Sequence, residues 1–123
     1  MLFSAKLMAF VAVTDAARAK AFYANVLGLK TVSEDSFAVV FDSGGTLIRA
    51  AIVKEVSLAP YTVLGWQVSD VASIVRSLSK IGVQFERYSF MEQDEFGIWT
   101  APGGARVAWF KDPDGNLLSV SQH

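Results

Sequence analysis

The chain has 123 residues, of which 52% are hydrophobic, with 11 basic and 12 acidic residues and a formal net charge of −1. This length fits one domain with one hydrophobic core, and the balanced charge provides no strong field to attract nucleic acid or anionic lipid. The absence of cysteine excludes disulfides, thiolate metal sites and cysteine nucleophiles.

The only histidine, His123, is the last residue of the sequence. A site that needs a histidine base, or two imidazole ligands, would therefore require groups from other chains. No apolar run approaches the roughly 20 residues of a membrane-spanning helix, and residues 1–6 lack the long apolar region of a signal peptide. We expect a cytoplasmic protein without a membrane or nucleic-acid partner.

The first half of the chain carries signals for a strand, a helix and three further strands. Residues Met8–Thr14 are apolar and β-rich, and Asp15 follows at the position of a helix N-cap. The helical spacing of apolar residues ends at Gly28, a residue that commonly terminates helices in the left-handed conformation. Three strands separated by polar turns are then predicted: Leu29–Val32, Phe37–Phe41 and Thr46–Val53.

The second half repeats this order. Asp70 is the second N-cap, preceded by an apolar strand and followed by a helical stripe that ends near Gly82. The strands predicted for this half are Val63–Ser69, Val83–Tyr88, Ala105–Phe110 and Leu117–Ser121. The sequence thus predicts an α+β fold, a single domain over residues 1–123 with two βαβββ modules in tandem: module one at about 5–53, a linker at 54–62 and module two at about 63–122.

The second repeat is longer than the first by about 15 residues, which lie between Phe90 and Gly104. This segment mixes acids, large apolar residues and turn residues. It fits either a loop that covers a site or an ordinary long hairpin. Its acids, Glu92, Asp94 and Glu95, could hold a cationic ligand or act as a base, and the alternative is a solvated loop.

Four pieces of sequence carry a resemblance to a known family: Phe10–Asp15, Ala21–Leu29, Gly65–Asp70 and Phe110–Asn116. In this order, on a repeated βαβββ frame, they resemble the vicinal oxygen chelate superfamily. That superfamily includes glyoxalase I, extradiol dioxygenases, and fosfomycin- and bleomycin-resistance proteins. The resemblance covers nearly the whole chain and implies two modules whose sheets curl around a cleft, usually within a homodimer.

The resemblance also implies where metal ligands would lie. Metal-dependent members hold the ion from the first and the last strand of each module, which here gives Met8, Arg49, Val63 and Ser119. A divalent ion prefers imidazole or carboxylate, whereas a thioether suits soft ions and an arginine adds positive charge. We therefore expect no metal and no other cofactor.

Polar anchors for a ligand are expected on the strand face that carries these four positions. Alternation along the strand places Gln67 on the face of Val63, so Gln67, Arg49 and Ser119 are the candidate polar contacts. Arg49 is interpreted either as a cation that holds a carboxylate or phosphate, or as a rim arginine paired with an acid.

Aromatic residues supply the remaining candidates. Tyr88 and Trp99 are candidate ligand contacts, and Trp99 fits either stacking on a planar molecule or anchoring its loop to the core. Trp66 falls on the opposite face from Gln67 and is predicted to be core. Trp109 is interpreted as a core residue or a dimer contact.

Three functions are compatible with this pattern. The first is a protein similar to bleomycin-resistance proteins that binds a small organic molecule, anionic or aromatic, in an apolar cleft without a metal. The second is a lyase, isomerase or dioxygenase of the same superfamily, which would rest on analogy of fold. The third is a structural or regulatory dimer whose cleft is filled by side chains. The sequence leaves open whether the protein is an enzyme.

Overall fold

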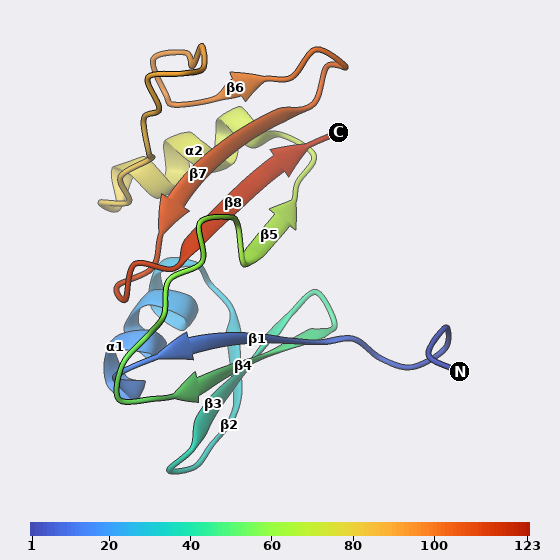
Figure 1. The fold of residues 1–123 in the computed structure, drawn as a ribbon, viewed down its shortest axis with the longest axis vertical. Coiled ribbons are helices and arrows are strands. Elements are labelled where there is room, and N and C mark those ends of the chain that lie inside the picture. The colour runs from blue at the N-terminus through green and yellow to red at the C-terminus, as the bar shows by residue number, and fades with distance from the viewer. The chain divides into compact units, whose positions relative to one another are not determined.

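Two four-stranded mixed sheets, one in each half of the chain, organise the computed structural model, which describes residues 1–123 (Figure 1). The chain divides into two units, Met1–Ser57 and Leu58–His123, each with its own sheet and helical connection. No helix has the length and apolar character needed to cross a membrane.

The first unit contains sheet A, with strand order β1-β4-β3-β2. Strands β1 and β4 are parallel, and the other neighbours are antiparallel. Its elements are β1 (Met8–Val13), α1 (Ala16–Lys20), the π-helix η1 (Ala21–Val26), β2 (Lys30–Glu34), β3 (Ala38–Ser43) and β4 (Thr46–Ile52).

Local signals set the helical connection of the first unit. The Asp15 side chain accepts a hydrogen bond from the Arg18 backbone N–H at 2.9 Å, so it caps the helix as the sequence predicts. Gly28 has φ of +80° and terminates the helical segment, because a residue without Cβ adopts this conformation easily. Within the π-helix, Tyr23 is fully buried and its ring lies 5.4 Å from that of Phe41, which ties the connection to the sheet.

The second unit contains sheet B, with strand order β5-β8-β7-β6 and a parallel β5–β8 pair. The side chain of Asp70 accepts from the Ser73 N–H and caps the helix. Helix α2 lies against β7 and β8, where Val71, Val75, Phe110 and Leu118 are fully buried. The elements are β5 (Leu64–Gln67), α2 (Val71–Lys80), β6 (Trp99–Thr100), β7 (Arg106–Lys111) and β8 (Leu117–Gln122).

The turn between β7 and β8 is held by buried polar groups. One Asp112 carboxylate oxygen accepts from the N–H groups of Asp114 and Asn116, and the other accepts from the Asn116 side-chain amide at 2.8 Å. Gly115 supplies φ of +91°. These bonds account for the Asp-Pro-Asp-Gly-Asn motif as a structural turn, and they fix which residues of β7 and β8 lie opposite each other.

The predicted α+β fold with two βαβββ modules in tandem is confirmed, and the strand predicted at Val83–Tyr88 is wrong. In that stretch only Phe85 forms a bridge, with Phe110, and the Glu86 N–H donates to the Trp109 carbonyl. The Tyr88 N–H bonds to a side chain, that of Gln93, and no ladder continues. The outer strand is instead β6, inside the extra segment. The predicted single domain stays a prediction.

Candidate functional site

Sheet B has one face covered by α2 and one face that no helix of its unit covers. Alternation separates the two sets, because buried Phe110 and Leu118 pair with each other on the α2 side. The opposite set pairs across the strands in two rows. We call it the helix-free face of sheet B, and its residues are Gly65, Gln67, Trp99, Val107, Trp109, Ser119 and Ser121.

Four aromatic rings gather at the β6 side of this face. The Trp109 ring centroid lies 6.1 Å from that of Trp99 and 5.7 Å from that of Tyr88, which meets it edge-on. Phe90 lies 5.5 Å from Tyr88 and is 78% exposed. We call Tyr88, Phe90, Trp99 and Trp109 the aromatic cluster. It offers flat, polarisable surface that suits a planar molecule.

A polar position adjoins the aromatic cluster. Ser119 lies directly opposite Trp109 in the β7–β8 pair and opposite Gly65 in the β5–β8 pair. A Cβ on Gly65 would fall 2.9 Å from the Ser119 hydroxyl oxygen, so the absence of a side chain there leaves room beside that hydroxyl. Gln67 lies exposed one row further along the same face. Ser119 is only 8% exposed, so a ligand stacked on Trp109 would have to approach its hydroxyl from the side of exposed Gly65.

The tyrosine of the cluster is held in its neutral form. Burial raises the pKa of the Tyr88 phenol above its usual value, the negative charge of Glu86 raises it further, and the positive charge of Lys111 opposes them. Lys111 and Glu86 form an ion pair at 3.4 Å. At neutral pH the Tyr88 hydroxyl thus keeps its proton and can donate a hydrogen bond to a ligand.

The segment between Tyr88 and Trp99 is braced by its own polar groups. One Asp94 carboxylate oxygen accepts from the N–H groups of Phe96 and Ile98, both at 2.9 Å. The Arg87 guanidinium donates to the carbonyls of Asp94 and Glu95, both at 2.5 Å. Asp94 therefore closes its own turn, which supports the structural interpretation of this acid over a role as a base.

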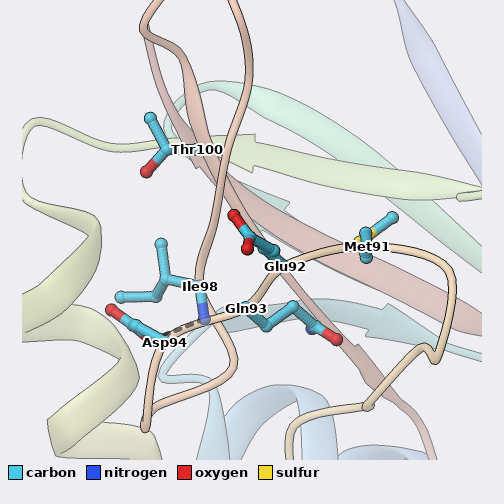
Figure 2. A pocket seen from close by; sticks show the side chains of 6 residues that line it. All are labelled: Met91, Glu92, Gln93, Asp94, Ile98 and Thr100. Carbon is cyan, nitrogen blue, oxygen red and sulfur yellow. Dashed lines mark hydrogen bonds between the residues drawn. The ribbon is translucent and has the colours of Figure 1, made fainter.

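An open hollow of about 540 Å³ lies along this segment, and Figure 2 shows the side chains that line it. Ile98 and Thr100 alternate with Trp99 along the chain, so the hollow is on the other side of β6 from the Trp99 ring. Glu92 and Asp94, two of the acids considered for a cationic ligand, line it, whereas the polar and aromatic contacts predicted from the sequence do not. The lining residues are Met91, Glu92, Gln93, Asp94, Ile98 and Thr100.

The first unit holds the other two predicted residues, Met8 and Arg49. The register pairs Met8 with Leu47 and Arg49 with Phe10, so both lie on the face of sheet A that carries exposed Phe10. Arg49 is half-buried, and its charge helps lower the pKa of Asp35. The larger causes of that lowering are the backbone N–H groups of Phe37 and Ala38.

The four positions that the family resemblance assigns to metal ligands carry groups that do not fit a divalent ion. Met8 lies two residues before Phe10, which pairs with Arg49, and Val63 lies two residues before Gly65, which pairs with Ser119. The two modules therefore use equivalent positions. The groups at these positions are a thioether, a guanidinium, an isopropyl group and a hydroxyl, which are poor ligands for the ions that prefer imidazole or carboxylate. No three His, Cys, Asp or Glu side chains lie close enough together to hold a metal.

The structure thus brings together five of the seven predicted residues. Gln67, Trp99 and Ser119 share the helix-free face of sheet B, Val63 continues its alternation, and Tyr88 contacts Trp109. The sequence interpretation missed Trp109 as a site residue. Counting back from the Asp112–Asn116 turn places Trp109 opposite Ser119, and this signal was available in the sequence.

Comparison with known proteins places this site in a family context. The sequence profile of the Glyoxalase/Bleomycin resistance protein/Dioxygenase superfamily matches residues 6–120. No curated protein matches the sequence. Solved structures of the same superfamily do match, over nearly the whole length of both chains.

Three of these structures illustrate the range. A superfamily member from Sphaerobacter thermophilus has a TM-score of 0.75 at 21% identity, with 100% of both chains covered. A lactoylglutathione lyase from Agrobacterium tumefaciens has a TM-score of 0.75 at 18% identity and covers 97% of this chain and 93% of its own. A fosfomycin resistance protein from Listeria monocytogenes has a TM-score of 0.76 at 17% identity, and the match covers 98% of this chain and 94% of that protein's chain. Identities this low show a shared fold alone.

Proposed function

The chain belongs to the glyoxalase/bleomycin resistance protein/dioxygenase superfamily, and on that premise we propose that it binds a small planar organic molecule without a metal. The ligand stacks on the aromatic cluster of the second unit. Its polar edge reaches the hydroxyls of Ser119 and Tyr88 and the amide of Gln67. The observation that carries this proposal is the packing of Tyr88 and Trp99 around Trp109, which lies opposite Ser119 in the β7–β8 pair.

The chemistry of this surface favours a binder over a catalyst. An apolar aromatic wall with a few placed polar groups is typical of small-molecule pockets. The raised pKa of the Tyr88 phenol keeps it protonated at neutral pH, so it cannot take up a proton as a base, and the Asp94 carboxylate accepts hydrogen bonds within its own turn. The positions that the family resemblance assigns to metal ligands carry Met8, Arg49, Val63 and Ser119, so the proposed binding uses no metal.

The first unit supports two further parts of the proposal. Its half-buried Arg49 guanidinium forms no ion pair and is proposed to bind a carboxylate or phosphate group within that unit. Leu7, Met8 and Phe10 are 75%, 40% and 61% exposed along the edge strand β1, which a homodimer would cover. Light scattering is expected to give the mass of a dimer, and a strictly monomeric protein would contradict this part.

A ligand screen tests the binding function. Planar aromatic acids, planar neutral aromatics and aliphatic acids are each added to the wild type and to Arg49→Ala, and thermal stability is recorded. Planar compounds are expected to raise the melting temperature because a ligand that binds only the native state stabilises it. Arg49→Ala is expected to lose the preference for acids and keep the preference for planar compounds. Stabilisation by aliphatic and planar acids alike would contradict stacking as the basis of binding.

A further inference from the structure

The side-chain amide of Gln93 forms hydrogen bonds to the main chain that a peptide group of a neighbouring strand would form in a regular sheet. Its Oε1 accepts from the Tyr88 N–H at 2.7 Å, and its Nε2 donates to the carbonyls of Glu86 and Gly97, both at 2.9 Å. A glutamine amide offers two donors and an acceptor with two lone pairs, so three of its four bonding positions are used. All three bonds go to the main chain.

These bonds connect the segments that carry two rings of the aromatic cluster. On one side they hold Glu86 and Tyr88, whose segment is also fixed by the Glu86 N–H bond to the Trp109 carbonyl at 2.7 Å. On the other side they hold Gly97, two residues before Trp99. Gln93 is moreover the bridge partner of Trp99 in the outer part of the sheet. One side chain therefore links the backbones of Tyr88 and Trp99, with Trp109 between them.

The surroundings leave little room for another arrangement. Gly97 is buried and has φ of +88°, and a Cβ at this position would lie 3.2 Å from the Cβ of Phe85. The carbonyl of Gly97 is thus fixed by its backbone, and the donor that meets it must come from Gln93. Loss of the amide would leave two main-chain carbonyls and one N–H without their partners, and the two segments would be free to separate.

We infer that Gln93 is a positioning residue that sets the spacing of Tyr88 and Trp99 around Trp109 and thereby selects the width of the planar ligand. This inference rests on the proposed function for its ligand, and on the hydrogen bonds alone for its geometry. Gln93 itself lies on the side of the hollow shown in Figure 2. It acts through the backbone of the cluster and does not touch the ligand.

The test uses Gln93→Glu in a Trp66→Phe background, which leaves Trp99 and Trp109 as the tryptophans that report on the cluster. At neutral pH the new carboxylate keeps an acceptor for the Tyr88 N–H but faces the Glu86 and Gly97 carbonyls without a proton. These carbonyls raise the pKa of the introduced carboxyl above its usual value of about 4.3. Protonation restores one donor, so the defect is expected to shrink as pH falls through that raised pKa.

Two readouts separate the inference from the proposed function. Near-ultraviolet circular dichroism of the tryptophan pair needs no ligand, and it is expected to differ from the control at pH 7 and to return toward it on acidification. Affinity for the best planar ligand is expected to fall about tenfold at pH 7 and to recover in the same pH range. Glu95→Gln, an exposed change in the same segment, is the matched control and is expected to show neither effect.

A Gln93→Glu protein with unchanged dichroism and unchanged affinity for the best planar ligand at pH 7 would overturn the inference, even while the wild type binds planar ligands. If the wild type binds no planar compound, the proposed function fails, and the dichroism still decides whether Gln93 holds the tryptophan pair. Should Gln93→Glu fold poorly at pH 7, Gln93→Met keeps the length of the side chain without its polar bonds. It is expected to show the dichroism change with no pH dependence.

Discussion

Replacement of Trp109 by alanine is expected to weaken the binding of a planar aromatic ligand by about 10- to 100-fold, which corresponds to about 1.4–2.8 kcal/mol. Trp109 is the ring that both Tyr88 and Trp99 contact, and it lies opposite Ser119. Its removal takes away the centre of the stacking surface and the support of its neighbours. Isothermal titration of wild type and variant with the same ligand measures the loss.

Two control variants make this result specific. Trp109→Phe keeps a ring at the centre of the cluster and is expected to retain part of the affinity. Trp66→Phe changes a tryptophan on the opposite side of sheet B, where Trp66 stacks with Phe110 at 6.5 Å, and is expected to bind like the wild type. If Trp109→Ala bound the ligand as tightly as the wild type, the aromatic cluster would not be the binding surface.

Replacement of Phe110, the next residue in β7, is expected to affect stability instead of binding. Phe110→Ala is expected to lower the free energy of unfolding by about 3–5 kcal/mol, because it removes a large buried ring and leaves a cavity. Phe110 is fully buried on the α2 side, and its ring lies 5.5 Å from that of Phe85. Urea denaturation followed by tryptophan fluorescence measures the change, because all three tryptophans lie in this unit.

The comparison with an exposed site tests that reasoning. Val32 is 51% exposed on edge strand β2, and Val32→Ala is expected to change the free energy of unfolding by no more than about 0.5 kcal/mol. A cost below about 1 kcal/mol for Phe110→Ala would mean that sheet B is packed differently from the structure described. Trp109→Ala and Phe110→Ala together separate the binding face from the core face of one strand.

The parts of the fold with local signals could be predicted from the sequence. Asp15 and Asp70 each bond to the N–H three residues ahead, so the signal and the structure lie within one helical turn. Gly28 and Gly115 have positive φ values that few other residues adopt, and both mark the ends that the sequence assigns to them. Because these signals are local, the tandem βαβββ order could be predicted without knowledge of contacts between distant residues.

The outer part of sheet B could not be predicted in this way. Residues 83–88 have the composition of a strand, but their hydrogen bonds depend on Gln93, a side chain several residues further along. Strand propensity describes a fit to a pleated surface and carries no information about such a bond. The position of Trp109 is a different case, because the β7–β8 turn fixes the register and alternation then gives the face.

The seven predicted site residues also differ in whether a local sequence signal or a distant contact places them. Strand alternation predicts Gln67 on the face of Val63, and the family resemblance implies Ser119; the β5–β8 register places Gln67 and Ser119 on one face of sheet B. Tyr88 and Trp99 were selected for their chemistry, and the ring contacts with Trp109 explain how they come together. Their roles in binding stay predictions, as do those of Met8 and Arg49 in the first unit.

The most direct test of the central claim is a titration of metal-stripped protein with the strongest planar ligand of the screen, followed by tryptophan fluorescence in the presence of a chelator. We expect saturable binding with one dissociation constant that changes by no more than about twofold when Zn²⁺, Ni²⁺, Mn²⁺ or Fe²⁺ replaces the chelator. Binding that appears only with a stoichiometric metal would contradict the account. It would also show that Met8, Arg49, Val63 and Ser119 are not the positions that decide metal chemistry in this chain.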